Sequence, residues 1–493
     1  MTPTLPLRRV LPVLAVYMIL SALGLYTHEL FLDEAHHFLL ARDSATLTDL
    51  YYNARYDGHP RLWHTLLFFI THVLTPNPIA MQVLQGLISA AVAFVFLRYA
   101  PFTLPIKIGI LFGYYFLFEY NILSRNYALG LLFLFLCCAC LANGRRPLLT
   151  VGILVLLMCN THIFFTFASI ALYGYLFVEY AGERKLFTRP FLIFTGLFLL
   201  GFACALVQAR VPQVDNVNLT PVKPDKWLSA GNFFFAVFGL VRGWLPIPTA
   251  NFFWNHFWLS EDRIGRTIGL LLFLCLLLFP ALPLRKKPKA LLFYYTTVAL
   301  LLLFFDVTQM TAARYFGMVF IFFLVAAWLS AEGRPDALAG TGPVFRMGLY
   351  AILALQLIVG AFAFEQDLAK PFSQSRNTAR YLQSLPSGEE IVVDGYNSGP
   401  MLCAYLGSKV FYLTTGERGS FCVWKKSYFP TPRPGIGQEL AQWPALQKLP
   451  RFILVANRKL DTCQNPHFQL SALRFFEKSI EGENYYVYQV NTR

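Results

Sequence analysis

The sequence predicts an α-helical protein that crosses a membrane many times and carries a small α/β domain at its C-terminal end. The first observation is composition, because the 493 residues are 56% hydrophobic and only 14% charged. A soluble domain has about 25% charged residues. The second is that apolar runs able to span a bilayer recur as far as residue 364. The third is that Lys and Arg gather in the short loops between these runs, a pattern that sets membrane topology.

The basic loops divide the chain into about eleven predicted crossings. The first run is expected to remain as a helix, because it lacks a small-residue cleavage site and many further runs follow. With all basic loops in the cytoplasm, the N-terminus lies inside and the C-terminus outside. These loops hold Arg8 and Arg9, Arg98 and Lys107, Arg145 and Arg146, Arg184, Lys185 and Arg189, residues 285–289, and Arg334 and Arg346. The predicted spans are 10–27, 79–98, 107–122, 126–142, 147–163, 164–180, 190–208, 264–283, 290–306, 314–331 and 346–364.

Three further apolar or aromatic segments do not fit this scheme as spans. The run 62–74 is short, and counting it as a crossing would put the next basic loop outside. We expect it to lie on the outer surface as an interfacial or re-entrant helix. The same placement is predicted for 232–248 and for the aromatic stretch 251–258, which is typical of an interfacial belt.

The chain changes character after residue 364. The stretch 373–385 has the pattern of an amphipathic helix, and four others have the pattern of strands. Those strand candidates are 389–396, 409–414, 451–459 and 483–490. We therefore expect two domains, a membrane module over 1–364 and a soluble α/β domain over 365–493 outside the membrane. No phosphate loop or catalytic motif occurs in the second.

The net charge of +14 does not indicate nucleic acid, because the basic residues sit in topology-setting loops. The partners expected from this distribution are membrane lipids. Of the nine cysteines, those in apolar runs are expected to be buried small hydrophobes. Cys403, Cys422 and Cys463 lie in the C-terminal domain, where at most one bridge can form and its pairing stays open.

The first outer loop contains the densest titratable cluster, FLDEAHHFLLARD (31–43). Ionisable groups at a membrane surface indicate a functional site. Asp33 is a candidate general base for an acceptor hydroxyl, with Glu34 beside it as a second candidate. The alternatives are that Asp33 is the N-cap of the next helix and that Glu34 is a first-turn acid favoured by the helix dipole.

A divalent cation is a second possibility for this loop, with Asp33, His36 and His37 as ligands. Adjacent helical histidines point about 100° apart, so interfacial solvation is the competing interpretation. No cofactor is expected to be required. All nine histidines fall on or near the predicted outer side.

Cationic and aromatic residues in three other outer turns are candidates for binding a phosphate. In DGHPRLW (57–63), His59 and Arg61 could meet an anionic headgroup, although Pro60 in a turn before a helix explains the motif alone. In EYNILSRNYALG (119–130), Arg125 lies between apolar helices and needs an anion, with a structural salt bridge to Glu119 as the alternative. Tyr127 is grouped with this set or is an interface aromatic.

The last outer turn carries Arg314 in FFDVTQMTAARYFG. A cation at a helix start opposes the helix dipole, which suggests a bound phosphate that the guanidinium grips with two donors. Snorkelling to lipid headgroups is the alternative. His162 marks another outer turn and is expected to be a plain loop residue.

Four motifs together resemble integral-membrane glycosyltransferases of the type-C fold (GT-C), among them bacterial relatives of protein O-mannosyltransferases and the lipid A aminoarabinose transferase. The motifs are LDEAHHFLLARD, DGHPRLW, SRNYALG and ARYFGMVF, and the resemblance covers roughly residues 1–330. The chain departs from the family at Arg61, where many relatives have a second proline, and at His59, where some have lysine.

The resemblance implies an inverting sugar transfer from a polyprenyl-phosphate donor at the outer face of a bacterial inner membrane. Asp33 would take the proton of a hydroxyl on a glycolipid, glycan or protein acceptor. Arg314, Arg125 or His59 would stabilise the departing phosphate. The alternatives are a transporter or flippase of a lipid-linked saccharide, a polymerase or ligase with a pyrophosphate-linked donor, and a scaffold protein. A transporter would place its polar groups near the membrane midplane and show internal repeats, and the sequence shows no repeat.

Overall fold

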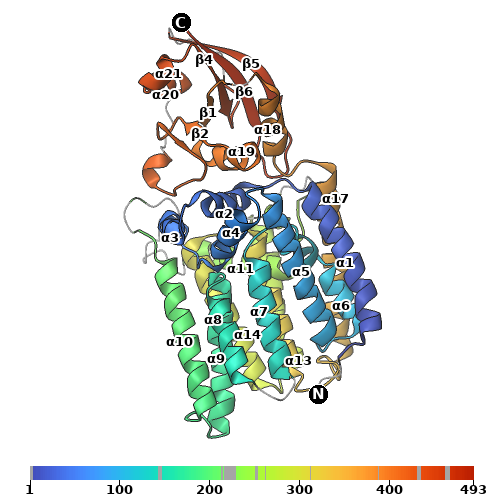
Figure 1. Cartoon of the computed structure of the whole chain (residues 1–493). Coiled ribbons are helices and arrows are strands. Elements are labelled where there is room, and N and C mark those ends of the chain that lie inside the picture. The colour runs from blue at the N-terminus through green and yellow to red at the C-terminus, as the bar shows by residue number, and fades with distance from the viewer. Residues whose placement is uncertain are drawn as a thin grey trace.

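The computed structural model describes residues 4–142, 147–212, 215, 229–249, 254–260, 262–310, 312–386, 388–429, 435–460 and 467–493. A bundle of long helices carries an α/β domain on one end, and α1 begins at the opposite end of the bundle (Figure 1). Arg145, Arg146, Cys463 and residues 251–253, which the sequence analysis singled out, lie outside the described residues.

Eight helical segments among the described residues are long and apolar enough to cross a membrane. These segments are formed by α1 (Leu7–Thr27), α5 (Ile79–Tyr99), α9 (Ile163–Gly182), α10 (Arg189–Ala209), α12 with α13 (Arg263–Leu278 and Ala281–Leu284), α14 (Pro288–Thr308), α15 with α16 (Ala313–Phe316 and Met318–Ser330) and α17 (Pro343–Ala369). The predicted polytopic helical fold is confirmed. The helix α17 runs past the expected domain boundary at residue 364.

The remaining helices of the membrane module are shorter. They are α2 (Leu32–Asp43), α3 (Leu47–Asn53), η1 (Ala54–Tyr56), α4 (Leu62–Val73), α6 (Leu104–Leu111), η2 (Tyr115–Glu119), α7 (Tyr127–Ala142), α8 (Leu148–Cys159) and α11 (Ala230–Trp244). The helix α4, from the short run 62–74, lies at the end of the bundle nearest the α/β domain, beside α2 (Figure 1).

The prediction of one regular span over 107–122 is wrong. The helix α6 ends at Leu111, and after a break the chain forms the π-helical turn η2. The break packs directly on α17, where a Cβ on Gly360 would lie 2.8 Å from the backbone nitrogen of Tyr114. This backbone-to-backbone contact has no counterpart in hydropathy, so the sequence did not reveal it. A π-turn inserted in this way re-aims the side chains that follow, among them Glu119.

The segment 232–248 is not among the eight candidate spans, as predicted, but it does not lie on the surface of the bundle. The helix α11 instead packs inside the bundle against α12, α14 and α16. Its last residue, Trp244, is buried and its ring lies 5.1 Å from that of Phe323. A Cβ on Gly243 would come within 2.3 Å of the backbone oxygen of Phe316, so glycine permits this close approach.

The C-terminal domain is built on a six-stranded sheet of order β3-β2-β1-β4-β6-β5. Strand β1 is parallel to β2 and β4, and the other pairs are antiparallel. Its elements are α18 (Ser375–Ser384), β1 (Ile391–Asp394), η4 (Tyr396–Ser398), α19 (Gly399–Leu406), β2 (Val410–Tyr412), β3 (Glu417–Gly419), η5 (Lys426–Tyr428), α20 (Ile436–Ala441), α21 (Pro444–Gln447), β4 (Arg451–Ala456), β5 (Phe468–Phe476) and β6 (Tyr485–Thr492). The predicted α/β character, helix and four strands are present, and β3 and β5 are additional.

The two faces of this sheet have different cores. Val392 faces a cluster with α20 and α21, whereas Val393 faces one shared with α18, α19 and two helices of the membrane module, α2 and α4. Alternate residues of a strand point to opposite faces, so this division follows from the strand pattern. Cys403 and Cys422 are both buried and free, so they do not pair with each other. This shared core packs the C-terminal domain against α2 and α4.

Candidate active site

A cavity of about 350 Å³ lies between the membrane module and the C-terminal domain. The membrane module contributes a carboxylate, a guanidinium group, an amide and aromatic side chains. The C-terminal domain contributes amides and carboxylates. The main polar residues around the cavity are Asp33, Asn255, Arg314, Asn397, Ser398, Asn457, Glu481, Glu483 and Asn484. A mixed lining of amides and carboxylates is suited to a ligand rich in hydroxyl groups.

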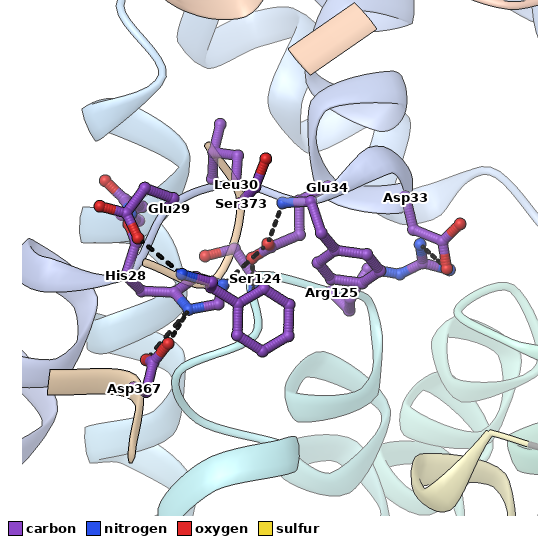
Figure 2. Close-up of polar contacts among 12 residues, drawn as sticks. His28, Glu29, Leu30, Asp33, Glu34, Ser124, Arg125, Asp367 and Ser373 are labelled. Atoms are coloured by element: carbon purple, nitrogen blue, oxygen red, sulfur yellow. Dashed lines mark hydrogen bonds and ion pairs between the residues drawn. The ribbon is translucent and has the colours of Figure 1, made fainter. Parts of the chain in front are cut away.

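Asp33 meets two arginines at the edge of this cavity. Its Oδ2 lies 2.7 Å from Nη2 of Arg314 and 2.8 Å from Nη1 of Arg125. Figure 2 shows Asp33 beside Arg125, and the side chain of Asp33 is 30% exposed. Burial works to raise the pKa of Asp33, but the two guanidinium groups outweigh it and the pKa is lowered. The carboxylate is therefore charged, and three residues predicted from distant motifs come together.

Arg125 and Arg314 both have hydrogen-bond donors that remain unpaired. Among the described residues, Nε of Arg125 and both Nε and Nη1 of Arg314 are buried without a hydrogen-bond partner. The guanidinium of Arg314 also lies 5.0 Å from the ring centre of Trp254. Buried donors without partners are costly, at roughly 1–3 kcal/mol each. The arrangement is thus prepared for an additional anion.

Glu34 faces away from the cavity and holds the loop that carries Arg125. It accepts a hydrogen bond from the backbone nitrogen of Ser124 at 2.5 Å (Figure 2) and another from that of Phe31 at 3.2 Å. Phe31 is the N-cap of α2, so the alternative that Asp33 caps this helix is wrong. Glu34 does not line the cavity, and a catalytic role for it stays a prediction.

A buried histidine joins Glu34 to α17. The Nε2 of His28 lies 3.0 Å from Glu34, and its Nδ1 lies 3.1 Å from Asp367 (Figure 2). Burial opposes the charged imidazole, but the two carboxylates prevail and raise the pKa of His28 to about 10. The resulting imidazolium, between two anions, ties the start of α2 to the end of α17. Sequence reasoning missed this residue, because Asp367 is 339 positions away and the separation of six residues from Glu34 matches no recognisable pattern.

The other predicted phosphate ligands are distributed around Arg125. The ring of His59 stacks on that of His162 at 4.9 Å, and the hydroxyl of Tyr127 lies 3.4 Å from Nε2 of His162. Burial and the nearby Arg125 lower the pKa of His59 to about 4, so it is a neutral donor at pH 7. His162 is buried in this stack and is not the plain loop residue that was expected.

Arg61 and Glu119 do not join the Asp33 cluster. The side chain of Arg61 donates to the backbone oxygen of Ala54 and does not line the cavity. Glu119 accepts hydrogen bonds from the hydroxyl of Tyr114 at 2.5 Å and from the indole of Trp254 at 2.9 Å. Glu119 therefore does not form the salt bridge with Arg125 that was the alternative expected from the sequence, since Arg125 pairs with Asp33.

The structure does not unite Asp33, His36 and His37 as a ligand set. Asp33 is taken by the two arginines, and Nε2 of His36 lies 3.0 Å from Asp57. The rings of His36 and His37 are 5.9 Å apart and have different neighbours. This separation follows from the rotation of about 100° per helical residue.

The C-terminal domain supplies two acids that the sequence analysis did not identify. Glu481 and Glu483 flank Gly482 in the turn before β6 and line the cavity. Oε1 of Glu483 accepts a hydrogen bond of 3.0 Å from the backbone nitrogen of Leu32. Burial and neighbouring carboxylates raise the pKa of Glu481 to about 8 and that of Glu483 to about 7. The sequence signal for these acids was their occurrence as a pair in a turn. No local pattern connects Glu483 with Leu32, which is 451 positions away along the chain.

The raised pKa values of Glu481 and Glu483 predict how the contribution of these acids to stability depends on pH. Folding raises their pKa values above the ordinary 4.5, so the folded state binds the protons more tightly. The contribution of these two acids to stability is then fully present below about pH 4.5 and is lost as the pH rises through about 7 to 8. Between pH 6 and pH 9, the thermal unfolding temperature of Glu483→Gln should fall less than that of the wild type. Glu477→Gln, an exposed acid at the end of β5, is the control and should follow the wild type.

No protein-family model and no curated protein sequence matches the chain. Among solved structures, the chain is similar to ArnT from Cupriavidus metallidurans, which was solved bound to undecaprenyl phosphate. The two share 12% sequence identity, and the similarity covers 97% of each chain with a TM-score of 0.51. It therefore includes the C-terminal domain, beyond the residues 1–330 that carry the motif resemblance. The chain is a multi-pass membrane protein with the type-C glycosyltransferase fold.

Proposed function

We propose that the protein transfers a sugar from a polyprenyl phosphate to a hydroxyl group of an acceptor, with inversion at the anomeric carbon. The observation that carries this proposal is the pair of buried arginines that share Asp33 and keep unpartnered donors. The similar ArnT was solved with undecaprenyl phosphate, which supports a lipid phosphate as the anion. No metal or other cofactor is needed for the proposed reaction.

The arginines stabilise the leaving group. As the bond between C1 and the phosphate oxygen breaks, its electron pair passes to polyprenyl phosphate. The free donors of Arg125 and Arg314 hold the growing charge on the phosphate oxygens. Guanidinium and phosphate match in a two-donor geometry that an ammonium group does not provide.

Asp33 is the proposed base. Its Oδ2 is held by the arginines, whereas Oδ1 has no partner among the described residues. When the donor phosphate occupies the guanidinium groups, their effect on Asp33 weakens and its pKa rises toward the working pH. Oδ1 then takes the proton of the acceptor hydroxyl while the hydroxyl oxygen attacks C1 on the face opposite the phosphate.

The acceptor is proposed to enter from the C-terminal domain. Asn397, Asn457 and Asn484 line that side of the cavity, and their amides can bind sugar hydroxyls. This favours a glycolipid or glycan acceptor over a protein hydroxyl. We place the cavity at the outer face of a bacterial inner membrane, because the basic loops lie at the opposite ends of the spans.

The proposal is tested by transfer from a panel of radiolabelled polyprenyl-phosphate sugars to native membrane extract, with purified protein in detergent. Arg314→Lys keeps the charge but loses the two-donor geometry, so transfer should fall by about 10- to 100-fold. Arg418→Lys, at an exposed arginine that pairs with Glu390, is the matched control and should retain full activity. Tight donor binding without transfer from any donor would contradict the proposal and favour a transporter of lipid-linked saccharides.

A further inference from the structure

Three residues of the first outer loop form a compact ligand set that the proposed reaction does not use. His37 lies on α2, Asp57 in the following turn and His64 on α4. One ligand atom from each lies within 4.8 Å of the others. The rings of His37 and His64 are 4.2 Å apart, and Nε2 of His64 is 3.5 Å from Oδ2 of Asp57.

Most polar atoms of this set have no hydrogen-bond partner. Among the described residues, Nδ1 of His37, both ring nitrogens of His64 and Oδ2 of Asp57 are buried without a hydrogen bond. His37 and His64 are 3% and 0% exposed, so bulk solvent does not reach these atoms. Leaving several such atoms unpaired side by side is expensive. A single cation between them would satisfy all three side chains.

We propose that His37, Asp57 and His64 bind a divalent transition-metal ion, with zinc as the best match. Two imidazoles and a carboxylate are a typical zinc donor set, with bonds of about 2.0–2.2 Å. A tetrahedral ion with these bonds needs donor atoms roughly 3.4 Å apart, which the separation of His64 and Asp57 already meets. Magnesium prefers oxygen donors and fits poorly.

The surroundings complete the site in the manner of known metal centres. The second oxygen of Asp57 lies 3.0 Å from Nε2 of His36. Hydrogen bonds of this kind orient a ligating carboxylate. His36 thus supports the site without binding the ion, which explains why two adjacent histidines have different partners.

The ion would act as a clamp rather than as a catalyst. It would join α2, which carries Asp33, to α4 and to the turn that carries His59. Asp33 itself is occupied by Arg125 and Arg314 and is not a ligand. Such an ion would stabilise the fold of the first outer loop whether or not the protein catalyses the proposed transfer reaction.

The first test is the metal content of the purified full-length protein, measured by plasma mass spectrometry after dialysis against a trace of zinc. We expect about one zinc ion per chain in the wild type and at least a tenfold decrease in His64→Ala. His72→Ala is the matched control, because His72 is on the same helix and instead contacts the backbone oxygen of Phe68. Wild-type protein without bound zinc, or a His64→Ala variant that keeps it, would overturn the proposal.

A second measurement does not depend on any variant folding. Removing the ion from wild-type protein with a chelator should lower its thermal unfolding temperature, and zinc but not magnesium should restore it. An unfolding temperature that is the same with chelator and with zinc would contradict a structural metal. Because unfolding is read without any sugar transfer, failure of this test is distinct from failure of the proposed function.

Discussion

Replacing Asp33 with asparagine is expected to reduce sugar transfer by about 10²- to 10⁴-fold while donor binding persists. Asparagine has nearly the same shape but cannot take the proton of the acceptor. It also leaves the charges of Arg125 and Arg314 less neutralised, so the donor phosphate should bind equally well or more tightly. The measurement is single-turnover transfer together with the dissociation constant of the polyprenyl-phosphate sugar.

The matched control for this change is Asp49→Asn. Asp49 lies in the same loop after α1, where it is exposed and its carboxylate accepts hydrogen bonds from Thr46, the N-cap of α3. Its variant should transfer sugar at nearly the wild-type rate. Normal transfer by Asp33→Asn would remove Asp33 as the base, and loss of donor binding in that variant would show that the carboxylate instead organises the arginines.

Replacing Glu34 with alanine is expected to destabilise the protein by about 3–5 kcal/mol, because it breaks a buried charge pair by removing one partner. The His28 imidazolium would lose one of its two carboxylates, and the backbone nitrogens of Ser124 and Phe31 would lose their acceptor. The measurement is the free energy of unfolding in detergent. Glu365→Ala, an exposed acid on α17, is the control and should change stability by less than about 0.5 kcal/mol.

Glu34→Gln separates stability from chemistry. Glutamine keeps one oxygen, which can accept the hydrogen bond of the Ser124 backbone nitrogen, although it loses the second acceptor used by Phe31 and His28. This variant should therefore fold, and it should retain measurable transfer if Glu34 only positions the loop with Arg125. A well-folded Glu34→Gln with no transfer would instead support the catalytic role predicted for it from the sequence. Unchanged stability of Glu34→Ala would contradict the buried network as a structural support.

The spans were predictable because hydropathy and basic loops are local properties of the chain. The meeting of Asp33, Arg125 and Arg314 was partly predictable, since each charge occurs at an end of an apolar helix and needs a partner there. What could not be predicted depends on contacts between distant segments. The break after α6 arises from a backbone contact with Gly360, and the acids before β6 reach the cavity only through the shared core of α2 and α19.

The closure of the cavity by Glu481 and Glu483 has a consequence for the making of the protein. Ribosomes synthesise these residues after all the membrane helices, so a nascent chain holds Asp33 and both arginines long before its cavity has an outer wall. The backbone nitrogen of Leu32 likewise has no carboxylate acceptor until Glu483 has been synthesised. A chain interrupted before residue 481 would insert into the membrane with an unfinished acceptor side, so competence for the proposed transfer is acquired only after residues 481–485 have been synthesised.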